Sequence, residues 1–155
     1  MAATREDIYR SALAALTEAP SMAGVTILIQ QIVQSTMRLS EWVEFSITGL
    51  APDAGRTDHT IERGALRVAC RWREQPTSDA GADISRVWAL ADKVTSALRW
   101  KDVLVRDFAS GGTGQGSNIV GLLACRELAV EDQGDAIDGV KSLVCVIEFV
   151  FSGSA

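Results

Sequence analysis

The chain has 155 residues, a hydrophobic content of 47% and a net charge of −5. This length predicts one domain, residues 1–155, with enough buried surface to fold without disulfides or metals. The acidic balance disfavours nonspecific binding to DNA or to anionic membranes. We expect a cytoplasmic protein that is not bound to membranes. No apolar run approaches the roughly 20 residues that span a bilayer, and the first residues do not resemble a secretory signal.

Residues 4–18 are predicted to form a helix. Thr4 can cap its first turn, with Asp7 in the reciprocal position of a capping box, and a following proline ends it. Residues 25–29 are β-branched and apolar, which favours a strand. Residues 30–39 are ambiguous between a helix and an extended segment. We favour an extended segment because Gln and Thr interrupt any helical stripe.

Residues 42–50 and 61–73 are predicted to be strands, because apolar and polar side chains alternate along both. The turn-forming composition of residues 51–59 predicts a loop between them, so the two strands should form an antiparallel hairpin. One face of the second strand is expected to be buried; it carries Leu66, Val68, Cys70 and Trp72.

The opposite face of that second strand carries a row of positive charge. Arg67, Arg71 and Arg73 share it, and we treat them as candidate interface residues. Three interpretations stay open. The row is a solvated face whose charges discourage edge aggregation, a contact for a carboxylate-rich protein surface, or a nucleic-acid contact. The last is the weakest, since no aromatic residues interleave with the arginines and the chain is acidic overall.

Residues 83–98 show the clearest helical periodicity in the chain. The helix is expected to be the keystone of the core, with Trp88 at the centre of its buried face. That predicted face consists of Ile84, Val87, Trp88, Ala91, Val94 and Leu98.

A glycine-rich stretch, residues 110–117, follows a short predicted strand at 103–108. It lacks the lysine of a Walker loop and the spacing of a dinucleotide-binding turn. We therefore expect a flexible hairpin loop that becomes ordered on contact with a protein partner. Its glycines complete the set of candidate interface residues: Gly111, Gly112, Gly114 and Gly116.

Residues 119–131 and 140–151 are predicted to be two long strands. The second is apolar on both faces, so it should be central in a sheet or lie at a subunit interface. The aspartates of residues 132–139 lack the spacing of a calcium loop and are expected to form a solvated turn. The predicted fold class is α+β: a mostly antiparallel sheet packed by one long amphipathic helix, plus an N-terminal helix.

The motifs of known catalytic chemistry are missing from the sequence. Cys70, Cys125 and Cys145 lie far apart within strand patterns, and His59 is the single histidine. These residues do not have the spacing of a zinc site, and no nucleophile motif accompanies the histidine. We expect buried reduced thiols, no metal, no cofactor and no enzymatic activity.

The layout of the whole chain resembles the tail terminator proteins of long-tailed, siphophage-like bacteriophages and of phage-derived particles. A short helix at residues 7–16 precedes an extended lead into EWVEFSI at 41–47. A strand with GALRVAC at 64–70 and a helix with WALADKV at 88–94 follow. A final hairpin ends in VIEF at 146–149.

This resemblance implies a structural virion protein that acts in tail assembly. Tail terminators form a hexameric ring that caps the tail tube, stops its polymerisation and offers a surface for head–tail joining. The expected partners are further copies of the chain, the tail-tube protein and a head-completion or connector protein. DNA would pass through the ring without sequence-specific binding. The protein would occupy the host cytoplasm during assembly and then the head-proximal end of the virion tail.

Two alternatives to the terminator role stay open. The chain could instead be a tail-tube or head–tail connector subunit. From a different class, it could be a small ligand-binding or enzymatic α+β domain, although such a domain needs a pocket with convergent polar groups.

Overall fold

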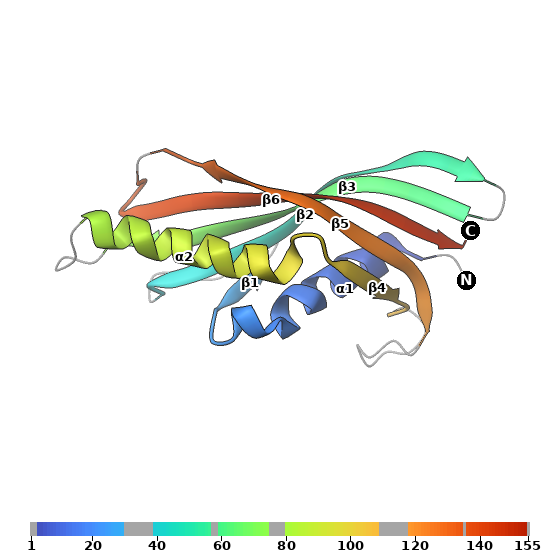
Figure 1. Ribbon diagram of the computed structural model, residues 1–155, viewed down its shortest axis with the longest axis horizontal. Helices are drawn as coiled ribbons and strands as arrows, with labels where there is room; N and C mark the ends of the chain where they lie inside the picture. Colours follow the sequence, from blue (N-terminus) through green and yellow to red (C-terminus); the bar gives the residue numbers. More distant parts are fainter. Residues whose placement is uncertain are drawn as a thin grey trace.

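The computed structural model describes residues 3–29, 39–56, 59–74, 80–108, 118–134 and 136–154. Helices and strands follow one another along the chain, as Figure 1 shows. In order, they are α1 (Arg5–Glu18), the short 3-10 turn η1 (Pro20–Met22), β1 (Ile27–Ile29), β2 (Glu41–Arg56), β3 (His59–Arg73), α2 (Ala80–Leu98), β4 (Asp102–Arg106), β5 (Ile119–Asp132) and β6 (Val140–Ser154).

The strands form one six-stranded sheet in the order β1-β2-β3-β6-β5-β4. β1 pairs with β2 in parallel, and every other neighbouring pair is antiparallel. The sheet curls into a half-barrel, and both helices lie on its inner side (Figure 1). α2 packs on the central strands β3 and β6, whereas α1 contacts β4, β2 and α2. β6 is therefore central, as its two apolar faces predicted.

The predicted fold class is wrong in its architecture. Strands account for 54% of the described residues and helices for 28%, and the sheet is a curled half-barrel rather than a sheet covered by one long helix. A sheet that curls brings its two edges toward each other, so its inner side must be filled by several elements. Here the strands supply most of the core side chains, and two helices share the remaining space.

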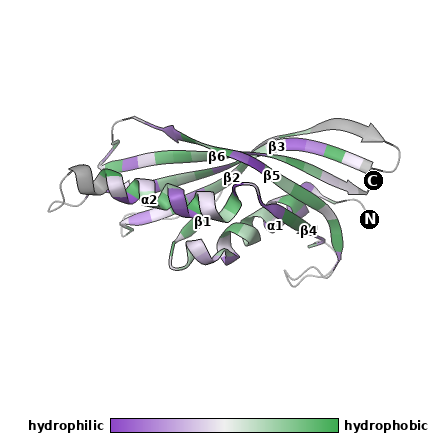
Figure 2. Cartoon of the chain, viewed as in Figure 1, coloured by the Kyte–Doolittle hydropathy of each residue, from purple (hydrophilic) through white to green (hydrophobic). Residues whose placement is uncertain are grey.

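The buried face of α2 is confirmed at Val87, Ala91, Val94 and Leu98, but the prediction is wrong at Ile84 and Trp88. Trp88 is 42% exposed and Ile84 is 47% exposed, so the predicted central residue lies at the flank of the helix. Leu90, which was left out of the predicted face, is 1% exposed. The side chains that face the sheet are Val87, Leu90, Ala91, Val94, Ala97 and Leu98. Hydrophobic residues therefore lie on more than one side of α2, as the mixed colours along it in Figure 2 show.

Close contacts between glycine backbone and phenylalanine rings accompany the curl of the sheet. A Cβ atom on Gly64 would lie 2.7 Å from Cζ of Phe149, and one on Gly121 would lie 2.3 Å from Cε2 of Phe151. Both rings are buried. Each ring occupies the space that a side chain at the glycine of the neighbouring strand would fill. Glycine in a strand interior commonly marks such a close approach or a bend.

Helix α1 covers the free edge of β4. The predicted capping box is present: Asp7 N–H donates to Thr4 Oγ1 at 3.1 Å, and Thr4 N–H donates to Asp7 Oδ2 at 2.8 Å. The other carboxylate oxygen of Asp7 accepts from Phe108 N–H at 2.8 Å, and Ser11 Oγ accepts from Arg106 N–H at 3.0 Å. Two buried polar side chains of α1 thus satisfy backbone donors that an edge strand would otherwise leave unpaired.

The hairpin of β2 and β3 is confirmed, but the predicted loop at residues 51–59 is wrong. β2 continues to Arg56, and His59 already belongs to β3. Register shifts after Thr48 and after Pro52 let β2 continue as a strand through its proline. Of the ambiguous segment, residues 30–38 lie outside the described residues.

Candidate protein interface

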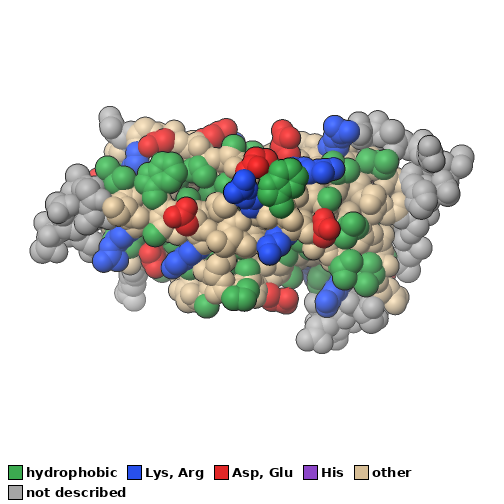
Figure 3. Space-filling model, viewed as in Figure 1, with side chains coloured by type: hydrophobic (Ala, Val, Ile, Leu, Met, Phe, Trp, Pro, Cys, Tyr) green, Lys and Arg blue, Asp and Glu red, His purple; other side chains and the backbone are tan. Residues whose placement is uncertain are grey.

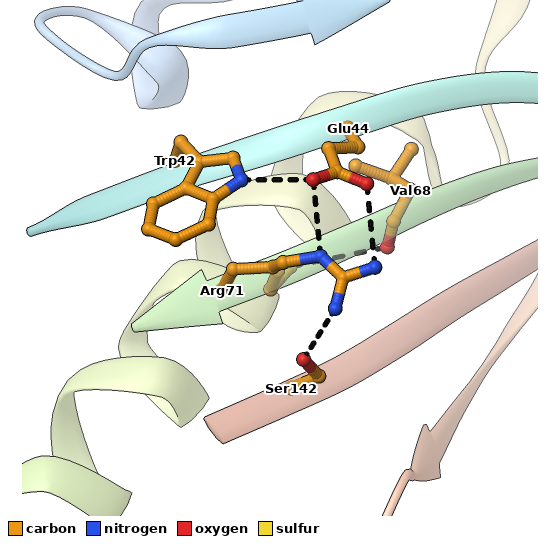
Figure 4. A network of polar contacts seen from close by, with 6 residues as sticks. Trp42, Glu44, Val68, Arg71 and Ser142 are labelled. Carbon is orange, nitrogen blue, oxygen red and sulfur yellow. Dashed lines mark hydrogen bonds and ion pairs between the residues drawn. The ribbon is translucent and has the colours of Figure 1, made fainter. Parts of the chain in front are cut away.

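The three predicted arginines do project from the outer face of β3, opposite the helices, but they differ in their partners. Nε of Arg71 lies 3.2 Å from Oε1 of Glu44, and its Nη2 donates to Oε2 at 3.3 Å. Its Nη1 donates to Ser142 Oγ at 2.7 Å, and Trp42 Nε1 donates to the same Glu44 at 3.0 Å (Figure 4). Arg71 is therefore committed to a network across β2, β3 and β6.

Arg73 is likewise used within the chain. Its Nε donates to the carbonyl of Leu39 at 3.2 Å, and its Cζ lies 5.5 Å from the ring centroid of Trp42. Arg67 is half-buried, opposite Ser46 and Val146, and has no ion-pair partner among the residues that the structure describes. Of the predicted row, Arg67 is the member whose charge is available to a partner. The other candidates, Gly111, Gly112, Gly114 and Gly116, lie outside the described residues.

A groove of about 620 Å³ crosses the outer face of the sheet. Small residues of β2 and β3 form much of its lining, and charged residues of β3, β5 and β6 stand around it. The lining residues are Thr48, Gly49, Ala51, Arg63, Gly64, Ala65, Arg126, Glu148, Phe149 and Val150. Arg126 and Glu148 are both exposed, and neither has an ion-pair partner within the described ranges.

A tryptophan that the sequence analysis did not single out lies just after α2. Trp100 is 57% exposed and has a positive φ of 54°, a conformation that is uncommon for a bulky residue. Its N–H donates to the carbonyl of Arg126 at 3.2 Å, and its Nε1 donates to Glu127 Oε2 at 3.1 Å. Nε of Arg99 lies 2.8 Å from the other oxygen of Glu127. The hydrogen bond from Arg99 lowers the pKa of Glu127 most, and the charge of Arg99 and the hydrogen bond from Trp100 lower it further.

The side chain of Trp100 is thus held in place while most of it faces solvent. The β-bulge between Cys125 and Leu128 places Arg126 and Glu127 where they can bind it. The sequence contains no signal for this conformation, because the residue that adopts positive φ after a helix C-terminus is usually glycine and here it is tryptophan.

Several other large apolar side chains are exposed. Figure 3 shows large hydrophobic side chains among charged ones on the face that carries α2. Across the described part of the chain, six large apolar side chains besides Trp100 are exposed: Ile84, Trp88, Leu104, Ile119, Leu122 and Ile137. Leu104 and Leu122 are direct cross-strand partners on β4 and β5. Figure 2 shows β4 and the adjoining part of β5 as strongly hydrophobic.

The cysteines are buried and reduced, as predicted. The Sγ atoms of Cys70 and Cys145 lie 4.0 Å apart in the core, and their hydrogen bond together with burial raises the pKa of Cys70. Burial raises the pKa of Cys125 to about 11. Among the described residues, no group of three or more His, Cys, Asp or Glu side chains is placed to hold a metal ion. No helix in the same part of the chain is long and apolar enough to cross a membrane.

Comparison with known proteins identifies the fold and nothing finer. No protein-family model matches the chain, and no curated protein matches it. A solved structure is similar over 96% of each chain, with a TM-score of 0.57 and 15% sequence identity. The fold of this chain is a single curled six-stranded sheet with two helices on its inner side, and large apolar side chains are exposed on the molecular surface. At this identity the likeness concerns the fold alone.

Proposed function

We propose that this chain is a structural virion protein, a phage tail terminator whose copies form a hexameric ring on the end of the tail tube. The ring would stop tube polymerisation and present its other surface to a head-completion or connector protein. The proposal starts from the resemblance of the chain to tail terminators, which extends from the N-terminal helix to the final hairpin.

The observation that carries the proposal is the distribution of exposed apolar side chains. Isolated surface hydrophobics are ordinary, but the described part of this chain exposes two tryptophans and five large aliphatic residues on three different elements and two connections. Tryptophans are enriched at the centres of protein–protein interfaces. A ring subunit needs several such surfaces, because it contacts two neighbours, the tube below and the head proteins above.

The acidic balance of the chain is compatible with a ring through which DNA passes. A net charge of −5 disfavours tight binding of the phosphate backbone, so the DNA could move through without being held. In this role the protein would be made and assembled in the host cytoplasm and would then reside at the head-proximal end of the tail.

The test combines the purified protein with the tail-tube protein encoded in the same genome. Cryo-electron microscopy of the tube tips should show one six-fold ring of this chain, and light scattering should show that tube elongation stops when it is added. Copies distributed along the whole tube would make the protein a tube subunit, and binding to the head proteins alone would make it a connector. Absence of any association with tube or head proteins would exclude a role in the tail.

A further inference from the structure

Helix α1 closes only part of the free edge of β4, along which it lies (Figure 1). Asp107 N–H donates to the carbonyl of Asn118 at 2.9 Å. At the other end of the strand, Cys125 N–H donates to the carbonyl of Lys101 at 2.8 Å. Positions 101 and 107 therefore bond to β5, and the alternation of an antiparallel ladder turns the N–H and C=O groups of the even-numbered residues of β4 toward the free edge.

The hydrogen bonds from α1 to this edge end halfway along the strand. Asp7 and Ser11, four residues apart on the helix, accept from two N–H groups that lie two residues apart on the chain beside them. Four helical residues advance about 6 Å and two strand residues about 6.6 Å, so the next pair in the series is Ala15 with Leu104. Alanine has no side-chain acceptor, so the series ends before Leu104.

A recess of about 440 Å³, the α1–β4 recess, opens where this series of hydrogen bonds ends. It is lined by the last turn of α1, the last turn of α2 and the start of β4. Small side chains of the helices and their connections form much of the lining: Ala15, Ala19, Ser21, Ser96 and Ala97. Val103, which is buried, forms an apolar part of the lining, so the recess offers a place for an apolar side chain beside a strand edge.

The charge around the α1–β4 recess is negative. Glu18 and Asp102 line it and are exposed, against one cation, Lys101. The C-terminal turns of α1 and α2 add the partial negative charge of two helix ends, and neither turn contains a basic residue. Arg99, the residue that follows α2, is paired with Glu127. The recess is therefore complementary to a positively charged group.

An extended peptide fits this combination of features. A strand edge binds an extended segment through main-chain hydrogen bonds, and pockets beside the edge select its alternate side chains. Natural proteins usually protect such edges with charges, prolines or a covering element. Here the hydrogen bonds of the covering helix end at the point where a recess opens beside the strand.

From these observations we propose that the α1–β4 recess binds an extended, basic segment of a partner protein. The segment adds main-chain hydrogen bonds to Asp102 and Leu104, places an apolar side chain against Val103 and directs a lysine or arginine toward Glu18 and Asp102. This binding goes beyond the terminator role and does not depend on it, since it follows from the edge, the shape and the charge of the recess.

The test selects ligands from a random peptide library displayed on phage, with the whole chain immobilised as bait. The enriched peptides are synthesised, and fluorescence anisotropy measures their Kd for the wild type and for charge variants. Glu18→Lys combined with Asp102→Lys reverses the charge of the recess. Lysine suits both positions, because one lies at a helix C-terminus and the other on an edge strand. Glu131→Lys, which reverses an exposed carboxylate on β5, is the matched control.

The enriched peptides should carry a lysine or arginine among β-branched or apolar residues. The double reversal should raise their Kd by about 10-fold or more, and the control should leave the Kd at the wild-type value. High salt should reduce the difference between the double reversal and the wild type. In the complex, hydrogen exchange at the Leu104 amide should slow, whereas exchange at the Arg106 amide, which already donates to Ser11, should not change.

The inference is overturned if no peptide is enriched, if the enriched peptides are acidic or uncharged, if the double reversal binds them as the wild type does, or if exchange at Leu104 does not slow. Its failure is separable from that of the proposed function, which is tested on tail tubes. Capping of tubes without peptide binding would keep the terminator role and remove this site. Peptide binding without capping would keep the site and remove the terminator role.

Discussion

Leu90→Ala and Trp88→Ala, two substitutions on neighbouring stripes of α2, test which face of the helix holds the core together. Leu90 is 1% exposed and lies in the core cluster, whereas Trp88 is 42% exposed. Removing a buried leucine costs about 2–5 kcal/mol, because transfer energy is lost and the cavity closes only partly. Trp88→Ala removes a larger side chain, but its site is open to solvent, so transfer energy is lost and no closed cavity is left behind.

The free energy of unfolding should therefore fall by about 4 kcal/mol in Leu90→Ala and by about 2 kcal/mol in Trp88→Ala. For a domain of this size, that difference of about 2 kcal/mol corresponds to a melting temperature about 4–8 °C lower for Leu90→Ala than for Trp88→Ala. Urea denaturation followed by circular dichroism measures both values on the same axis. A larger loss in Trp88→Ala than in Leu90→Ala would refute the assignment of the buried stripe and restore Trp88 to the core.

Three further predictions concern the edge of the sheet, its curl and its buried thiols. Asp7→Ala should lower the free energy of unfolding by about 2–4 kcal/mol in urea titrations, because it removes part of the helix cap and leaves the partly buried Phe108 N–H without its acceptor. Asp7→Asn should recover part of the loss, and equal losses in the two variants would contradict the hydrogen-bond account. Gly64→Ala should lower the free energy of unfolding by about 1–3 kcal/mol, since its new Cβ meets the Phe149 ring. The double mutant with Phe149→Leu should lose less stability than the sum of the two single mutants. Losses that add exactly would show that the two residues are not coupled. The stability that a protonated Cys125 contributes is fully present below its ordinary pKa of about 9 and is lost as the pH rises toward about 11. The free energy of unfolding of the wild type should therefore fall faster over this pH interval than that of Cys125→Ala. Parallel plots of unfolding free energy against pH would show that the thiol does not contribute.

The candidate interface was predictable only in part. The alternation along β3 places Arg67, Arg71 and Arg73 on one face, and the structure agrees. Which of these charges is free depends on residues 27 and 71 positions away, Glu44 and Ser142, that pair with Arg71 across the sheet. The importance of Trp100 could not be read from a pattern, because its exposure and its positive φ result from how β5 and α2 meet.

The sequence by itself determined the local structure of this protein. The capping box of Thr4 and Asp7, the proline after α1, the alternation of β2 and β3 and their antiparallel pairing all depend on residues close together in the chain. Such features are governed by backbone hydrogen bonding and side-chain spacing within one or two turns, so composition and periodicity reveal them.

Tertiary structure decided the curl of the sheet and everything that depends on it. Periodicity identifies α2 as amphipathic and places Val87, Ala91 and Val94 on its buried face. Only the folded structure shows that this face extends to Leu90 and leaves Trp88 exposed. The close packing of Phe149 on Gly64 and the hydrogen bond from Phe108 to Asp7 join segments 85 and 101 residues apart. These contacts depend on the distances between elements, which no local pattern encodes, because each element's propensity is satisfied equally well in many arrangements.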